Sequence, residues 1–323
     1  MENRKSVIII GGGPAGLAAT YDLARRKIPA TCFEADSMVG GISRTIEHKG
    51  FRFDVGGHRF FSKIQAVNDL WHEILGEDFL TRPRLSRIYY NNHFFAYPLQ
   101  PANAVSGLGL LNSIRIMASF LKAKVCPLPQ EHSFDQWVTN RFGARLYDIF
   151  FKTYTEKVWG IPCSEISAEW AAQRIKGLSL YSAITNALFK QKKVIKTLIN
   201  DVQYPRFGPG QMYETMAVKA EKNGASVLLN HRVEEILHKN GRVAGVAVAS
   251  PEGRDETTGS DFISSMPITE LVLRMRPEPP AEVVDAARSL RYRSLLTVNF
   301  MLDCPQKLPD TWIYVHDSNV RMG

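Results

Sequence analysis

A glycine loop near the start of the chain constrains the fold more than any other feature. The loop reads G-G-G-P-A-G at residues 11–16, directly after the β-branched run at 6–10 and directly before a helical pattern at 17–26. A buried strand, a glycine loop and a helix in this order form the first unit of a dinucleotide-binding domain. The sequence therefore predicts an α/β fold with a Rossmann-like FAD- or NAD(P)-binding domain.

The residues of this loop have distinct expected tasks at a cofactor. Gly11 permits the tight turn, Gly13 lets the backbone approach a pyrophosphate, and Gly16 lets the helix pack close to the strand. Pro14 and Ala15 stand between these glycines, where the helix N-terminus offers N–H groups to an anion. We predict that these five residues bind the cofactor; a glycine turn that serves packing alone is the alternative.

An acidic residue closes the second expected strand of this unit. That strand covers residues 30–34 and ends in Glu34, eighteen residues after Gly16. A carboxylate at this place accepts hydrogen bonds from a ribose, and it repels a 2′-phosphate. NADP is therefore disfavoured, while NAD and FAD both remain.

A second glycine pair favours FAD. Gly40 and Gly41 are placed so that the backbone and Arg44 reach the phosphates or the flavin side of a cofactor. Residues 34–45 read E-A-D-x-x-x-G-G-x-x-R-T, and with the preceding loop they resemble the flavin amine oxidase superfamily, which includes protoporphyrinogen oxidases, phytoene desaturases and, more distantly, UDP-galactopyranose mutases. The resemblance implies FAD, a GR2-type flavoprotein architecture, and a set of cofactor-binding residues that adds Ala35, Gly41, Ile42 and Arg44.

A histidine follows a third glycine pair. Gly56 and Gly57 precede His58, and such glycines allow a backbone to lie against a flat ring. In the family that the chain resembles, this segment passes beside the isoalloxazine, which makes all three residues candidate cofactor contacts and His58 a candidate catalytic residue. A hydrogen-bonded structural histidine is the alternative.

The rest of the chain separates into a helical part and a later sheet. Apolar residues recur at helical spacing within 134–151, 168–175 and 180–189, whereas 227–229, 232–237 and 243–248 have the composition of strands, followed by 262–267. We expect a discontinuous FAD-binding domain at 1–95 and 205–270, and a helical and sheet substrate domain at 96–204 and 271–323. The family resemblance implies cofactor contacts at Val233, Ser265 and Met266; plain sheet structure is the alternative there.

The middle of the chain narrows the resemblance. Residues 154–160 read Y-T-E-K-V-W-G, which is similar to an element of the UDP-galactopyranose mutases and their oxidoreductase-like relatives. Carried over, Arg174 grips a diphosphate, and Tyr154 and Trp159 line a substrate site near the flavin. Lys157 then joins His58 as a candidate acid or base. Residues 56–61 read G-G-H-R-F-F, which departs from the G-P-H-x-F of bacterial mutases.

Composition narrows the classes of partner. The formal charge of +8 comes from scattered lysines and arginines without a nucleic-acid-binding motif, so a small-molecule substrate is expected and nucleic acid is not. The four cysteines contain no C-x-x-C pair, which argues against a metal site or disulfide framework and favours the cytoplasm. Residues 107–121 form an amphipathic pattern rather than a transmembrane segment. We expect that helix to be buried against the core; peripheral membrane contact is the alternative.

Three functions follow, in order. The first is an FAD-dependent oxidoreductase that transfers a hydride from an organic substrate to flavin N5. The second is a UDP-galactopyranose mutase-like isomerase that uses reduced flavin on a nucleotide-sugar. The third is a non-catalytic nucleotide-binding fragment, because family members continue well beyond Gly323 and a chain without that continuation is expected to hold FAD weakly.

Overall fold

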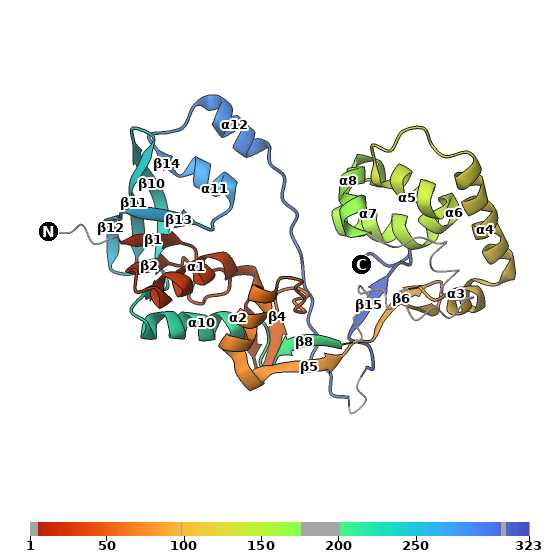
Figure 1. Cartoon of the computed structure of the whole chain (residues 1–323), viewed down its shortest axis with the longest axis horizontal. Helices are drawn as coiled ribbons and strands as arrows, with labels where there is room; N and C mark the ends of the chain where they lie inside the picture. Colours follow the sequence, from red (N-terminus) through yellow and green to blue (C-terminus); the bar gives the residue numbers. More distant parts are fainter. Residues whose placement is uncertain (1–5, 98, 176–200, 305–307, 323) are drawn as a thin grey trace. The chain divides into compact units, whose positions relative to one another are not determined.

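The structure is a computed structural model that describes residues 6–97, 99–175, 201–304 and 308–322, in two compact units (Figure 1). Unit 1 comprises Met1–Arg82 and Val202–Asp303, and unit 2 comprises Pro83–Asp201 and Cys304–Gly323. The expected domain boundaries at 95 and 270 differ from these. Strand β6 (Ser86–Tyr90) pairs with β15 (Trp312–Val315) inside unit 2, and β14 (Met275–Arg276) pairs with β10 (Arg232–Lys239) inside unit 1.

Unit 1 contains most of the strands. Its further strands are β1 (Val7–Ile10), β2 (Ala30–Phe33), β3 (Thr45–His48), β4 (Phe51–Asp54), β5 (Phe79–Pro83), β8 (Asp201–Pro205), β9 (Ser226–Leu228), β11 (Arg242–Ser250), β12 (Gly253–Thr258) and β13 (Asp261–Ser264). Its helices are α1 (Pro14–Arg25), α2 (Gln65–Leu75), α10 (Gly210–Lys222), α11 (Ile268–Leu273) and α12 (Ala281–Ser289).

A parallel sheet in the order β13-β1-β2-β9 forms the centre of unit 1. Strand β1 is buried along its whole length, which suits a β-branched run in a central parallel strand. Its residues alternate between two cores: Val7 and Ile9 face one, Ile8 and Ile10 the other. This confirms the predicted α/β class and gives the sheet a covered layer on each face.

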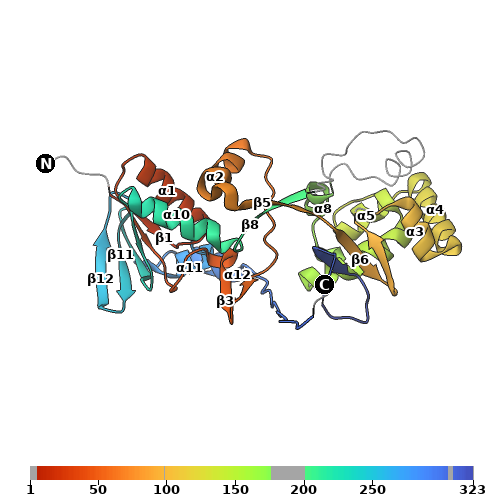
Figure 2. The same cartoon turned by 90° about the horizontal axis from the view of Figure 1, so that it is seen from below.

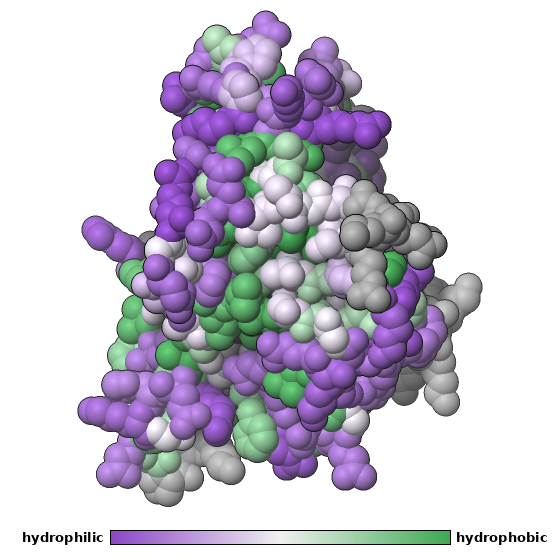
Figure 3. All heavy atoms as spheres, turned by 90° about the vertical axis from the view of Figure 1, so that its left-hand side faces the viewer, coloured by the Kyte–Doolittle hydropathy of each residue, from purple (hydrophilic) through white to green (hydrophobic). Residues whose placement is uncertain are grey.

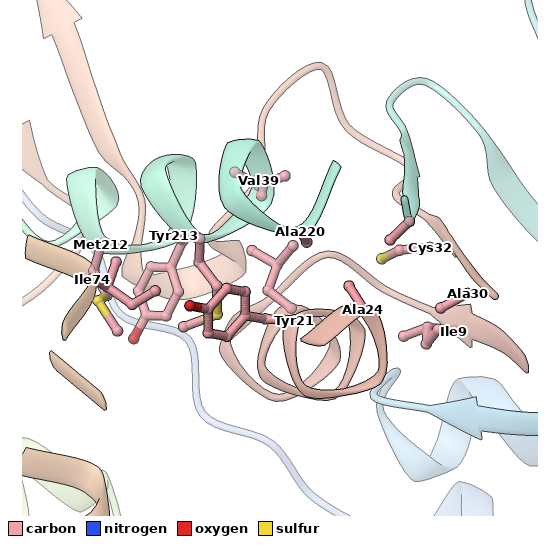
Figure 4. Packing of buried hydrophobic residues seen from close by; sticks show 14 of the residues in the cluster. Ile9, Tyr21, Ala24, Ala30, Cys32, Val39, Ile74, Met212, Tyr213 and Ala220 are labelled. Carbon is pink, nitrogen blue, oxygen red and sulfur yellow. The ribbon is translucent and has the colours of Figure 1, made fainter. Parts of the chain in front are cut away.

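Helices cover one face of the parallel sheet. Helices α1 and α10 lie side by side, with α2 beside α10 (Figure 2). Figure 4 shows Tyr21 and Ala24 of α1 beside Met212, Tyr213 and Ala220 of α10. These buried side chains remove a large apolar area from water, and that burial is the main favourable term for this layer.

A second sheet covers the opposite face. It has the order β12-β11-β10-β14, and Val233, Ile236, Val246 and Val248 pack against Ile8, Ile10 and Phe33 of the parallel sheet. The outer strand β12 carries exposed charged residues, and Figure 3 shows polar residues (purple) over much of the surface on this side, with apolar residues (green) between them. Strand β12 was not predicted, because its sequence G-R-D-E-T-T has no apolar alternation.

Unit 2 is mainly helical. Its helices are α3 (Pro101–Leu108), α4 (Leu110–Val125), α5 (Phe134–Phe142), α6 (Ala144–Tyr147), a π-helical turn (Asp148–Lys152), α7 (Thr153–Trp159) and α8 (Ala168–Arg174). A three-stranded sheet, β15-β6-β7, accompanies them, with β7 at His93–Ala96. The expected helix at 180–189 lies outside the described residues.

Two glycines break helices that the sequence pattern made continuous. Gly109 separates α3 from α4, and Gly143 separates α5 from α6, with φ values of +80° and +81°. A Cβ on Gly143 would stand 2.7 Å from the backbone nitrogen of Phe120 in α4. The glycine therefore permits both the turn and the close approach of two helices, which a periodicity argument does not detect.

Candidate functional site

The loop between β1 and α1 depends on glycine at two positions. Gly11 has a φ of +98°, in the region that favours glycine. A Cβ on Gly16 would lie 1.8 Å from the carbonyl oxygen of Gly11, so the helix can meet the strand this closely only with glycine there. Ser265 donates from its Oγ to the carbonyl oxygens of Ile10 and Gly11, at 3.0 and 3.1 Å. The tight turn is thus fixed from both sides.

The start of α1 is open to a ligand. Gly13 is the N-cap residue, Pro14 follows at the first helical position, and none of the described side chains caps this end. A Cβ added to Gly13 would meet only the Cα of Gly41 within 4 Å, at 3.9 Å. Twelve residues of α1 direct their dipole toward this point, which favours an anion. Ala15 is exposed in the same turn.

The carboxylate of Glu34 lies under this loop. Its Oε2 accepts the backbone N–H of Gly12 at 2.6 Å, and its Oε1 accepts that of Asp36 at 2.9 Å. Two backbone donors hold the side chain in one orientation at the end of β2. Ala35 is half-buried beside it.

The second glycine pair lies against the first loop. The N–H of Gly40 donates to the carbonyl of Gly12 at 2.9 Å, and a Cβ on Gly41 would stand 3.2 Å from the Cα of Gly13. Arg44 forms an ion pair with Asp36 at 2.8 Å. Ile42 is 76% exposed, so its side chain is open to a ligand or to solvent. The residues that the sequence grouped around the cofactor therefore gather in one region.

The segment after β4 positions a histidine. Gly56 has a φ of +101°, and Gly57 is exposed. The Nε2 of His58 lies 2.7 Å from the carbonyl oxygen of Val55. A carbonyl only accepts, so Nε2 carries the proton, and Nδ1 of the neutral ring is left as an acceptor.

The late strand residues have mixed roles. Val233 is buried in the core between the two sheets, and Met266 packs against the same core. Ser265 instead contacts the glycine loop directly, as its hydrogen bonds to Ile10 and Gly11 show. Ser265 is therefore the one of the three that the structure joins to the loop.

Helix α7 carries three of the predicted residues of unit 2. It begins directly after the π-helical turn, a feature that often marks functional sites. The ammonium of Lys157 donates to the carbonyl oxygens of Val315, Asp317 and Met322. Burial lowers the pKa of this amine, and Asp317 partly offsets that shift.

Aromatic rings surround the other two residues of α7. Tyr154 stacks on His316, with ring centroids 4.8 Å apart and planes 10° apart, and it meets Tyr314 edge to face. Trp159 meets Trp170 edge to face at 5.1 Å. Arg174 ends α8, and its side chain lies outside what the structure describes.

His316 is a site residue that the sequence reasoning missed. The ring is 4% exposed, and its Nδ1 has no hydrogen-bond partner among the described residues. Burial, and then the nearby charge of Lys157, lowers the pKa of His316 to about 4. Strand β15 brings it to α7 from far along the chain, so no local signal identifies it.

His58 and Ser265 lie in unit 1, while Lys157, Tyr154 and His316 lie in unit 2. Within the described ranges, no group of three or more histidine, cysteine or acidic residues is arranged to hold a metal ion. Unit 1 thus offers an anion-binding helix start with a fixed carboxylate, and unit 2 offers an aromatic cluster with a buried histidine.

Known proteins with similar sequences form one broad group. Residues 14–318 match the family described as flavin containing amine oxidoreductase. An L-amino-acid oxidase from Crotalus adamanteus is 24% identical over 358 aligned residues, which cover 99% of this chain and 65% of that protein. The chain thus spans just under two thirds of the length of this relative.

Solved structures share the fold. A reduced UDP-galactopyranose mutase superposes with a TM-score of 0.73 at 21% identity, covering 89% of this chain and 62% of the mutase. An oxidoreductase from Methanosarcina mazei gives a TM-score of 0.60 at 15% identity, covering 88% and 65%. At these identities the likeness establishes the architecture.

Proposed function

The chain belongs to the family of flavin-containing amine oxidoreductases, and from this premise we propose that it is an FAD-dependent enzyme that oxidises a small amine or amino acid. The observation that carries the proposal is the open start of α1 above a fixed Glu34 carboxylate. The family supplies the cofactor and the general class of reaction. The amine or amino acid is the proposed substrate class, supported by the likeness to L-amino-acid oxidases.

The residues of unit 1 fit FAD on chemical grounds. A pyrophosphate needs backbone N–H groups and close approach, and the Cα of Gly13 faces space that an added Cβ would fill. A ribose needs an acceptor, and Glu34 is held at the end of β2 by two backbone donors. When bound, FAD accepts a hydride and so supplies the oxidation.

We assign to His58 the role of general base. Its Nε2–H is used by the carbonyl of Val55, which leaves Nδ1 to accept a proton from a substrate. For Lys157 we propose a positioning role, because its ammonium already donates to three carbonyl oxygens that follow Tyr314. Tyr154, Trp159 and Arg174 are the proposed substrate contacts.

Anaerobic reduction of bound FAD by a panel of amines and L-amino acids tests this function. We expect at least one of them to bleach the flavin absorbance, and His58→Ala to slow bleaching by about 10²-fold or more at unchanged FAD affinity. Bleaching at the wild-type rate in His58→Ala would remove His58 as the base. Bound FAD that no amine or amino acid reduces would remove the substrate class.

A mutase-like isomerase is the second candidate, favoured by the Y-T-E-K-V-W-G element and by the aromatic rings around Tyr154. Such an enzyme must bind the diphosphate of a nucleotide-sugar, and a guanidinium suits that task. A calorimetric titration with UDP distinguishes the two. The isomerase predicts UDP binding that Arg174→Ala abolishes, and no UDP binding to oxidised or reduced protein excludes it.

A further inference from the structure

Helix α4 of unit 2 exposes a continuous apolar surface. We define the outer stripe as its exposed aliphatic residues and the methionine among them, which are between 38 and 80% exposed: Leu110, Leu111, Ile114, Met117, Leu121 and Val125. They recur at intervals of three and four, so they lie on one face of the helix. The expectation that this helix is buried therefore holds for only part of it.

The opposite face of α4 packs against the core of unit 2. Ile116, Phe120 and Ala123 are buried, and Ile116 belongs to the core that contains Trp137 and Phe142. The helix is thus apolar on two faces. The inner face accounts for its place in the fold, and the outer stripe is left for another partner.

Positive charge flanks the outer stripe. Arg115 and Lys122 are exposed and follow Ile114 and Leu121 directly in the helix. The sequence from 83 to 130 contains no aspartate or glutamate, and it carries Arg84, Arg87, Arg115, Lys122 and Lys124. Asp310 pairs with Arg87, whereas Arg115 and Lys122 lie beside the stripe itself.

We propose that the outer stripe of α4 docks the protein on an anionic membrane surface. An aliphatic face with cations along its edge is the pattern of a helix that lies in the lipid interface. Acidic headgroups attract the cations, while the aliphatic side chains enter the boundary of the acyl chains. A second copy of this chain is a poorer occupant, because a twofold contact would bring Arg115 and Lys122 of two copies together.

The geometry favours lying on the membrane rather than crossing it. Among the described residues no single helix is long and apolar enough to span a bilayer. Helices α3 and α4 reach that length only as a pair, and they are bent by 119° at Gly109. Helix α4 alone has sixteen residues, with its cations distributed along the length rather than only at the ends.

Co-sedimentation of the full chain with vesicles tests the docking surface. We expect binding to phosphatidylcholine vesicles that contain phosphatidylglycerol, weaker binding to phosphatidylcholine alone, and weakening by salt. Leu121→Glu with Val125→Glu is expected to reduce binding at least tenfold. Val218→Glu, on an exposed position of α10 in unit 1, is the matched control and should bind as the wild type does.

Several outcomes would overturn the proposal. These are no vesicle binding by the wild type, equal binding by the Leu121→Glu, Val125→Glu variant, and a wild-type dimer that this variant dissociates. Unchanged circular dichroism and thermal unfolding of the variant are expected, because both side chains point away from the core, and they separate lost docking from lost folding. An Arg115→Gln, Lys122→Gln variant checks the charge: it should lose the preference for phosphatidylglycerol.

Discussion

The two units carry their candidate residues in different ways. In unit 1 the glycine loop, Glu34 and the Gly40–Gly41 pair lie within one short stretch of sequence and contact one another through backbone hydrogen bonds. In unit 2 the cluster of Tyr154 and His316 joins α7 to a strand from the far end of the described chain. Local sequence thus specifies the first site, and tertiary packing assembles the second.

This difference determines how each site should respond to substitution. Glycines in unit 1 are required because atoms crowd around their Cα positions, so the substituted residue itself predicts the damage. The cluster in unit 2 depends on β15 staying beside β6, so a change away from the cluster should disturb it. The predictions below test this contrast.

The largest effect is expected from Gly16→Ala in unit 1. Its Cβ would stand 1.8 Å from the carbonyl oxygen of Gly11, and both neighbours are backbone that cannot move alone. We expect a loss of at least about 4 kcal/mol in the free energy of unfolding, measured by urea titration. Gly13→Ala is the control, since its Cβ has open space. Equal urea midpoints for Gly16→Ala and wild type would refute the crowding argument.

The next effect concerns the anchor of β15. Arg87 forms a bidentate ion pair with Asp310, whose side chain is 3% exposed. Arg87→Leu leaves that carboxylate buried without its partner and should cost roughly 3 kcal/mol. Arg254→Leu is the control, because its pair with Glu235 is largely exposed and should cost under about 1 kcal/mol. Similar urea midpoints for the two variants would contradict the anchor.

His316 should make the stability of unit 2 depend on pH. Burial and Lys157 lower its pKa to about 4, below the usual value of 6.5, so the unfolded chain binds this proton first as the pH falls. Stability is then full above pH 6.5 and lost toward pH 4. Between pH 7 and pH 4.5 the wild type should lose roughly 2.5 kcal/mol more than His316→Phe, which keeps a stacked ring. Parallel pH profiles in urea titrations would exclude a neutral buried His316.

Sequence alone predicted the nucleotide-binding part of the fold well. The β-branched run of β1, the glycine loop and the following helix are contiguous, so their periodicity and spacing contain the needed information. The helix begins three residues before the predicted start, because Pro14 already has helical geometry. The contacts among Gly12, Glu34 and Gly40 follow from that same short segment.

Sequence could not predict the parts that depend on packing. The breaks at Gly109 and Gly143 interrupt regular apolar patterns, and the second is needed because α4 passes close to Gly143. The outer strand β12 lacks an apolar face because one side is solvent. His316 is one histidine among eight, and only the pairing of β15 with β6 brings it to Tyr154.

FAD titration of Gly13→Ala tests the central claim most directly. Gly13 has a φ of −75°, and its Cβ would meet only the Cα of Gly41 within 4 Å, so the variant should fold as the wild type does. The same methyl group would stand where a pyrophosphate approaches the helix start. Followed by flavin fluorescence, the wild type should bind FAD, and the variant should bind at least about tenfold more weakly at an unchanged urea midpoint. Equal FAD affinity in the two proteins would contradict the account.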